Sequence, residues 1–335
     1  MNLLLLGGTR FLGRHMVDAA LARGHHVTTF TRGRSAAAQA GVDALTGDRD
    51  PRVGDSLAAL ERRAFDAVVD LSGYVPRVVQ ASAQLLRDAV PHYVFVSSVS
   101  VYADVSKPGV DEDAPLAVLA DAASEDVLRE YGALKAACER AVGDVYGGDA
   151  TMVRPGLIVG PFDPTDRFAY WVARFVHPAL LGERGTRAVV PAPPARPIQL
   201  IDARDLAAWI VDIVELRVHG RFNAVSANGR WSFGDLVDAL IAASPDAPQP
   251  AWVDDATLQR HGVEPWVGLP LWLPATEADH AGFMCIDARR AIAAGLHARA
   301  LAATIADFAR WLATRDNAGA WKMTLSARRE AGILG

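Results

Sequence analysis

Short apolar runs alternate with longer stretches of helical periodicity over the first 160 residues. The apolar runs predict buried strands, at residues 2–6, 26–30, 43–45, 65–71, 92–98 and 150–155. The stretches between them predict helices, at residues 11–23, 76–89 and 124–147. Strands that alternate with crossover helices are typical of an α/β fold with a doubly wound parallel sheet.

The pattern changes after residue 160, because proline and tryptophan become denser. Helices are predicted at 167–180, 203–216, 232–243 and 301–315, and short strands at 198–201 and 221–225. We interpret residues 1–160 as a nucleotide-binding domain and residues 161–335 mainly as a smaller mixed α/β substrate lobe. Late elements near 198–225 are expected to return to the first domain.

Composition narrows the class of protein. The chain has 335 residues, of which 51% are hydrophobic, and a net charge of −5, which argues against a dedicated nucleic-acid partner. No apolar stretch approaches the roughly 20 residues of a membrane span, so no membrane association is expected. Cys138 and Cys285 lie far apart without metal-type spacing, which predicts reduced thiols, no metal and a cytoplasmic protein.

The segment LLLLGGTRFLG (3–13) runs from a strand through a glycine turn into a helix. Gly7 permits the tight turn, and Gly13 lets the helix pack close to the sheet. The helix N-terminus then offers free N–H groups and a positive dipole end to a pyrophosphate. The context of strand, turn and helix therefore predicts a dinucleotide site.

The segment TRGRS (31–35) follows the second predicted strand. NAD enzymes usually carry an acidic residue here, which holds the ribose 2′-hydroxyl. Arg32 and Arg34 stand in its place, and a guanidinium suits a phosphate. Arg10 could add a further contact. We therefore predict NADP in preference to NAD, with a solvated arginine loop as the alternative.

A serine-containing strand and a Tyr/Lys pair complete the chemistry. The strand is YVFVSSVSVY (93–102), and in YGALK (131–135) Tyr131 and Lys135 share one helix face. A nearby ammonium lowers the pKa of a phenol and brings it into range for acid/base catalysis. A serine on the neighbouring strand can hydrogen-bond the reacting oxygen.

These motifs, in this order, resemble the extended short-chain dehydrogenase/reductase family, from the first strand to RPGLIVGP (154–161) and on through QLIDARDLA (199–207). The resemblance implies a Rossmann-like fold, a small-molecule substrate and a homodimer. It implies that Ser98 polarises the substrate oxygen, Tyr131 is the acid/base and Lys135 holds the nicotinamide ribose. The cofactor residues that it implies are Gly7, Thr9, Arg10, Phe11, Leu12, Gly13, Arg32, Arg34, Ser35, Asp48, Arg49, Leu71, Ser72, Gly73 and Pro155.

One departure from the family pattern matters, since Arg10 replaces the usual middle glycine of the turn. GGTRF is similar to atypical branches of the family, which include reductase or epimerase homologues and chloroplast stem-loop RNA-binding proteins. The leading prediction is an NADP(H)-dependent oxidoreductase acting on a carbonyl, an alcohol or a related C=X group. The alternatives are a nucleotide-sugar epimerase/dehydratase and a non-catalytic dinucleotide-sensing or RNA-binding protein.

Two segments are candidates for the substrate side. PFDPTDRFAYWVAR (161–174) predicts a substrate loop in which Asp166, Arg167, Tyr170 and Trp171 reach the substrate. EPWVGLPLWLP (264–274) predicts either an apolar wall at the site or a cover for the lobe's own core. The second lobe shows no convincing cluster for a nucleotide diphosphate, although Arg167, Arg174 and Arg184 could supply one.

Overall fold

The computed structural model describes residues 1–34, 37–315 and 321–335. Seven parallel strands form its central sheet, in the order β3-β2-β1-β4-β5-β6-β11. The strands are β1 (Asn2–Leu6), β2 (His26–Thr31), β3 (Val42–Thr46), β4 (Ala67–Asp70), β5 (Tyr93–Val96), β6 (Ala150–Pro155) and β11 (Gly220–Ala224). This sheet confirms the predicted doubly wound, Rossmann-like fold class.

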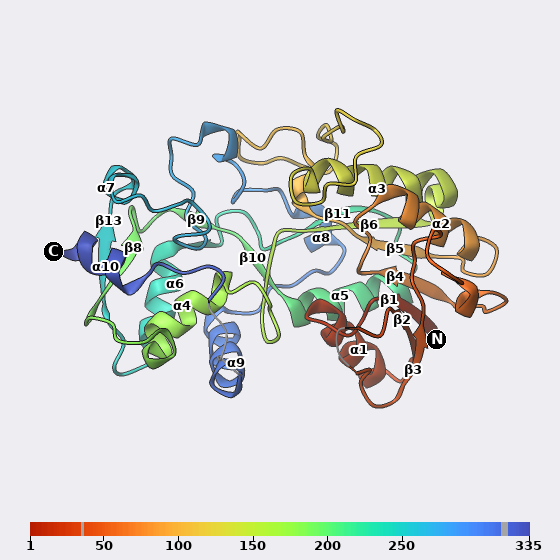
Figure 1. Cartoon of the computed structure of the whole chain (residues 1–335), viewed down its shortest axis with the longest axis horizontal. Helices are drawn as coiled ribbons and strands as arrows, with labels where there is room; N and C mark the ends of the chain where they lie inside the picture. The colour runs from red at the N-terminus through yellow and green to blue at the C-terminus, as the bar shows by residue number, and fades with distance from the viewer. Residues whose placement is uncertain (35–36, 316–320) are drawn as a thin grey trace.

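Helices cover both faces of the sheet (Figure 1). The helices α1 (Leu12–Ala22) and α5 (Ala203–Glu215) pack on one face, and α2 (Pro76–Leu86) and α3 (Tyr131–Tyr146) on the other. The four leucines of β1 alternate between the two resulting cores and are all buried. Because each buried leucine contributes about 1.5–3 kcal/mol, this short apolar run fixes the strand at the centre of the fold.

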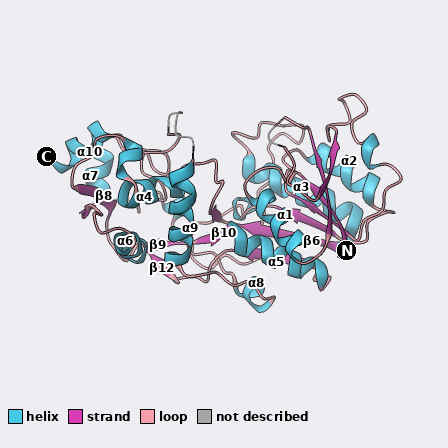
Figure 2. Ribbon diagram, turned by 90° about the horizontal axis from the view of Figure 1, so that it is seen from below, coloured by secondary structure: helices cyan, strands magenta, loops and turns pink. Residues whose placement is uncertain are grey.

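A second lobe lies beside the sheet domain (Figures 1 and 2). Its core contains the fully buried Trp171 and Trp272. The elements of this lobe are α4 (Arg167–Val176), β8 (Arg187–Pro191), α6 (Phe233–Ala242), β13 (Gln249–Val253), α7 (Asp255–Arg260), α9 (Leu301–Thr314) and α10 (Ala327–Leu334). Within the three described ranges, no helix is long and apolar enough to cross a membrane.

Small two-stranded sheets and short helices complete the chain. The remaining strands are β7 (Leu157–Val159), which pairs with β10 (Leu200–Asp202), and β9 (Pro197–Ile198), which pairs with β12 (Trp231–Ser232). The remaining helices are α8 (Arg289–Ala293) and the 3-10 helices η1 (Ala58–Leu60), η2 (Val99–Val101), η3 (Gly147–Asp149), η4 (Pro178–Leu181) and η5 (Ala278–His280).

The helix predicted from residue 124 begins at Tyr131 instead. The side chains of Asp121 and Asp126 accept hydrogen bonds from nearby backbone N–H groups, which turns the preceding segment. Aspartate side chains compete with helical bonding in this way, and the periodicity of the segment does not reveal it. As a result, Tyr131 lies in the first turn of α3, at the end of the helix.

Candidate active site

The glycine turn after β1 has the backbone geometry that only glycine adopts easily. Gly7 and Gly8 have φ of 115° and 110°. A Cβ on Gly13 would lie 2.6 Å from the Cα of Gly8, so α1 packs directly against the turn. No side chain caps the N-terminus of α1. The backbone N–H groups of Gly13 and Arg14 donate to the carbonyls of Arg10 and Phe11, so the Leu12 N–H and the positive end of the helix dipole are what the turn offers to a pyrophosphate.

A cavity of about 980 Å³ opens at the carboxyl ends of the strands of the central sheet. It lies at the topological switch point, where the strand order reverses between β1 and β4. Three predicted catalytic residues line it, Ser98, Tyr131 and Lys135. The predicted cofactor residues that line it are Gly7, Thr9, Arg10, Phe11, Leu12, Gly13, Arg32, Arg34, Asp48, Arg49, Leu71, Ser72 and Pro155. Residues distant in sequence thus meet at one site.

One predicted cofactor residue of the described chain, Gly73, falls outside this lining. Gly73 lies behind the cavity wall, where its carbonyl accepts a hydrogen bond from Lys135. A Cβ at Gly73 would come within 2.5 Å of the Phe95 ring. Its smallness therefore serves packing at the end of β4. Ser35 lies outside the described residues.

Three exposed arginines gather at the end of the cavity formed by the glycine turn and the end of β2. Arg10, Arg32 and Arg34 line it, and none forms an ion pair with another described residue. Arginines that no described acidic residue pairs, beside a helix N-terminus without a side-chain cap, fit the several negative charges of a dinucleotide phosphate. The residues present therefore fit the predicted group.

Arg49 also reaches the cavity lining, but its guanidinium is engaged elsewhere. It donates two hydrogen bonds of 2.6 Å to the carboxylate of the fully buried Asp70, and it also bonds Ser82. Burial alone would raise the pKa of Asp70, but Arg49 outweighs it and holds that pKa below its usual range. Arg49 therefore braces the ends of β3 and β4 at the cavity wall, and its predicted cofactor contact stays a prediction.

Ser98 follows β5 and begins η2. Its Oγ accepts the backbone N–H of Ser100 at 3.1 Å. A Cβ at Gly132 would lie only 2.1 Å from the Ser100 carbonyl oxygen, so the first turn of α3 packs flush against η2. This close approach brings the loop of Ser98 and the helix of Tyr131 to the same wall of the cavity.

Lys135 is buried and well bonded. Its ammonium donates to the carbonyls of Gly73 and Val96, each at 2.7 Å, and lies 4.2 Å from the centre of the Phe95 ring. Burial lowers the pKa of Lys135 to about 8. Two of its three N–H groups are therefore committed, which leaves one donor for a ligand in the cavity.

The pKa of Tyr131 differs from the expectation. Burial and the neighbouring Tyr74 raise this pKa above its usual value, whereas Ser98 and Arg167 act to lower it. The lowering that the sequence predicts is therefore not found in the protein by itself, because burial outweighs both groups. A phenol in this state holds its proton and is prepared to donate it.

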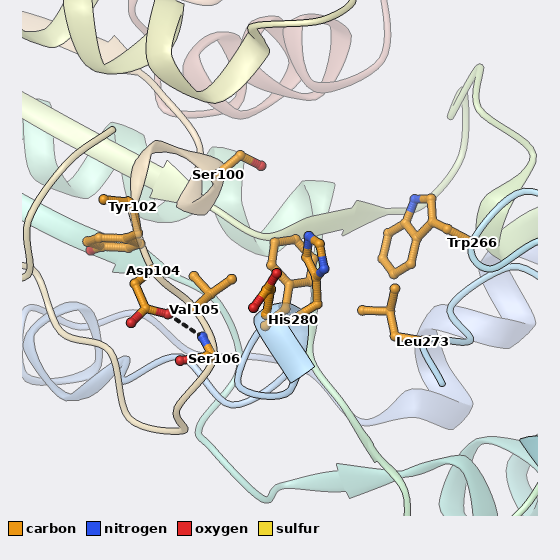
Figure 3. Close-up of a pocket in the computed structure, with 11 residues that line it drawn as sticks. Ser100, Tyr102, Asp104, Val105, Ser106, Trp266, Leu273 and His280 are labelled. Carbon is orange, nitrogen blue, oxygen red and sulfur yellow. Dashed lines mark hydrogen bonds between the residues drawn. The ribbon is translucent and has the colours of Figure 1, made fainter. Parts of the chain in front are cut away.

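A second cavity of about 730 Å³ borders the first, and Ser100, Trp266 and Phe283 line both. Figure 3 shows His280 in the middle of this view, between Trp266 on one side and Tyr102 on the other. Trp266 thus contributes to the predicted wall. Trp272 does not, because it is fully buried and bonds Asp255, as the core-cover interpretation holds.

The predicted substrate loop contributes Pro164, Thr165 and Arg167 to the cavity lining. Of the four candidates, only Arg167 lines the cavity. Tyr170 and Trp171 are fully buried, and Asp166 is buried and accepts from Arg315 and Lys322. The helical face of α4 that carries these residues points into the core of the lobe.

The three arginines that could have supplied a diphosphate site do not gather. Arg174 and Arg184 both donate to the buried Glu330 of α10, with distances of 3.1 Å. These two side chains therefore tie α10 to the second lobe. Arg167 is the one member of the predicted trio in the cavity.

Sequence reasoning did not identify several lining residues. Tyr74 comes directly after Gly73, and its ring lies 5.4 Å from the Lys135 ammonium. Ser100 lies two residues after the predicted catalytic serine. The position of Tyr74 beside the predicted Leu71-Ser72-Gly73 path was the available signal. Met323 and Phe283 come from irregular segments without a motif.

Comparisons with known proteins agree with this architecture. Residues 3–224 match the NAD dependent epimerase/dehydratase family. A curated relative, the chloroplast stem-loop binding protein of 41 kDa b from Arabidopsis thaliana, is 28% identical over 190 residues. That match covers 50% of this chain and 46% of the relative, so it spans about half the length of each.

Solved structures share the fold over nearly the whole chain. The Bordetella bronchiseptica enzyme WbmH in complex with NAD⁺ is 18% identical, with a TM-score of 0.65 over 93% of this chain and 98% of that one. The human epimerase family protein SDR39U1 with NADPH is 21% identical, with a TM-score of 0.59 over 92% and 99%. At these identities the likeness shows the fold.

Proposed function

Because the chain belongs to the NAD dependent epimerase/dehydratase family, we propose that it binds NADP(H) in the larger cavity and catalyses hydride transfer at an alcohol or carbonyl carbon of a small molecule. Membership confirms the predicted family and the predicted class of NAD(P)-dependent enzyme. The observation that carries the proposal is the meeting of the glycine turn, the Ser98 loop and the Tyr131–Lys135 helix in one cavity.

The cofactor choice rests on the end of β2. An NAD-type acidic residue is absent there, and Arg32 and Arg34 face the cavity without an ion-pair partner among the described residues. A 2′-phosphate would neutralise them. Relatives of this fold have been solved with NAD⁺ or with NADPH, so both cofactors are compatible with the architecture.

The roles of the chain's own residues follow from their environment. Bound nicotinamide would supply or accept the hydride. Ser98 lines the cavity and would hydrogen-bond the substrate oxygen, and Tyr131, whose pKa is raised by burial, would give that oxygen a proton. Lys135 has one uncommitted N–H with which to hold a ribose hydroxyl.

The test compares two phenol deletions on the same helix. Tyr131→Phe should lower kcat on a carbonyl substrate by about 10²–10⁴-fold and leave NADPH affinity nearly intact. Tyr146→Phe is the matched control, because the Tyr146 hydroxyl is buried at the far end of α3 and has no hydrogen-bond partner in the described chain. Undiminished turnover of Tyr131→Phe would refute the acid/base assignment.

Family membership favours a second candidate on the same site, an epimerase or dehydratase in which hydride leaves and returns within one turnover. The two candidates differ in their cofactor balance. An oxidoreductase consumes one NADPH for each product formed, which absorbance at 340 nm follows, whereas an epimerase yields a new stereoisomer with no net change in cofactor.

The partner that we propose is a small molecule. A net charge of −5 supports this choice over RNA, whose binding depends on a basic surface. A gel-shift titration with RNA at low salt tests it, and a salt-dependent shift at micromolar protein would contradict it.

A further inference from the structure

Arg167 forms no ion pair with another residue of the described chain. It is the first residue of α4, and its Nε donates to Thr165 Oγ1 at 3.0 Å. Thr165 Oγ1 in turn donates to Asp163 Oδ1 at 2.7 Å. This relay orients the guanidinium at the cavity wall, while its two terminal amino groups bond no residue in the described part of the chain.

The surroundings make this arrangement costly for the protein alone. Burial lowers the pKa of Arg167, and Asp163 and Tyr131 only partly oppose that effect. A cation in the first turn of a helix also faces the positive end of the helix dipole. Because both burial and the helix dipole disfavour the half-buried Arg167 guanidinium, we expect an anion of the ligand to balance its charge.

The adjoining cavity, of about 730 Å³, has acidic side chains in its lining. Among the described residues that line it there is no lysine or arginine, and Asp104 and Asp279 supply two carboxylates. Trp266 and Tyr102 supply aromatic surfaces on either side of the space (Figure 3). A phosphate or diphosphate placed there would meet like charge and no donor fork. The space instead suits an uncharged, hydroxylated or aromatic group.

We infer that the substrate is a carboxylic acid whose carboxylate lies on Arg167, close to the carbon that reacts at Tyr131, and whose uncharged remainder fills the cavity beside Trp266. A single guanidinium with two free amino groups matches one bidentate carboxylate. A nucleoside diphosphate would place its charge in the compartment that lacks cations. The inference rests on the proposed function and specifies its substrate as a hydroxy acid, an oxo acid or a sugar acid.

The experiment uses pairs of probes that share a carbon skeleton. D-Glucuronate is compared with D-glucose, L-lactate with 1,2-propanediol, and UDP serves as the nucleoside diphosphate probe. Each is titrated by calorimetry and nicotinamide fluorescence into the NADPH complex of wild type, Arg167→Gln and Arg167→Lys. Arg129→Gln is the matched control, since it removes the same charge from a side chain that is 87% exposed.

In wild type and Arg129→Gln, at least one carboxylate should bind ten or more times more tightly than its uncharged partner. Arg167→Gln should bring that ratio close to one without changing the affinity for the uncharged partner, and Arg167→Lys should restore part of it. Equal binding within both pairs, an unchanged ratio in Arg167→Gln, or tighter binding of UDP than of either acid overturns the inference. Failure of NADPH itself to bind wild type would instead refute the proposed function.

Discussion

The two arginines after β2 offer a direct measurement of the cofactor phosphate. Arg32 and Arg34 are exposed, line the cavity and have no ion-pair partner among the residues described. Replacing both with glutamine removes two charges and breaks no side-chain hydrogen bond or ion pair among the described residues. Stability should therefore be unchanged, and any effect should appear in cofactor affinity.

The expected magnitude follows from exposure. A hydrogen bond to a charged group contributes about 1.5–3 kcal/mol when shielded from water, and solvent reduces an exposed pair toward about 1 kcal/mol. Two such contacts with a 2′-phosphate should together contribute about 2–3 kcal/mol, which corresponds to a roughly 30- to 160-fold weaker Kd for NADPH. NADH lacks that phosphate, so its Kd should change by less than about threefold on this reasoning.

Fluorescence titration of NADPH and NADH with wild type and Arg32→Gln/Arg34→Gln measures both constants. A double variant of surface arginines, Arg129→Gln/Arg328→Gln, controls for the loss of two positive charges from the whole molecule. The preference of wild type for NADPH should also shrink as salt rises, because screening acts on exposed pairs. Equal losses for the two cofactors would show that the arginines do not recognise the 2′-phosphate.

Three further predictions concern the frame of the site. Gly13→Ala places a Cβ 2.6 Å from Gly8 Cα, so it should cost about 1–3 kcal/mol in the free energy of unfolding and weaken NADPH binding at least tenfold. Gly143→Ala is the control, because a Cβ there would meet no atom within 4 Å, and this variant should be neutral or stabilising in the same denaturation series. Asp70→Asn leaves Arg49 buried without its charge partner and should lower the free energy of unfolding by about 3–5 kcal/mol. Asp149→Asn breaks an exposed ion pair with Arg87 and should lower it by less than about 1 kcal/mol. Similar losses for the two variants in urea denaturation would contradict this prediction. Burial lowers the pKa of Lys135 from 10.5 to about 8, so between these values the unfolded chain binds one proton more than the folded chain. The free energy of unfolding should therefore rise with pH over that range in wild type, by a margin on the order of 1–3 kcal/mol that Lys135→Met lacks, and equal pH slopes would refute the lowered pKa.

The cofactor half of the site could be predicted because local geometry fixes it. A buried strand, a turn with φ near 110° at Gly7 and Gly8, and a helix that touches the turn at Gly13 occupy one continuous segment. Only a narrow set of residue types satisfies these constraints, so the sequence carries the signal directly. The same holds for Tyr131 and Lys135, whose spacing on one helix face is independent of the rest of the fold.

Side-chain partners across the sheet were not predictable in this way. Arg49 follows β3 in a segment that the family resemblance places beside the cofactor, yet Asp70 at the end of β4 captures its guanidinium. Likewise, Glu330 draws Arg174 and Arg184 away from the substrate side. In each case the competing carboxylate is distant in sequence. Nothing in the local pattern indicates which of several arginines remains unpaired.

The substrate side of the site depends on which arginine remains without an ion pair. Its walls come from η2, the loop before α4 and the segment around Trp266 and Phe283, which share no periodicity and no motif. The specificity of such a site depends on which charges the fold leaves without partners, and this becomes visible only when every ion pair has been assigned. Once Arg174 and Arg184 are assigned to Glu330, and Arg49 to Asp70, Arg167 is the guanidinium left beside Tyr131. The substrate chemistry that we infer therefore depends on a tertiary property: of the arginines that the sequence offers for the substrate side, Arg167 is the one that no described acidic residue pairs.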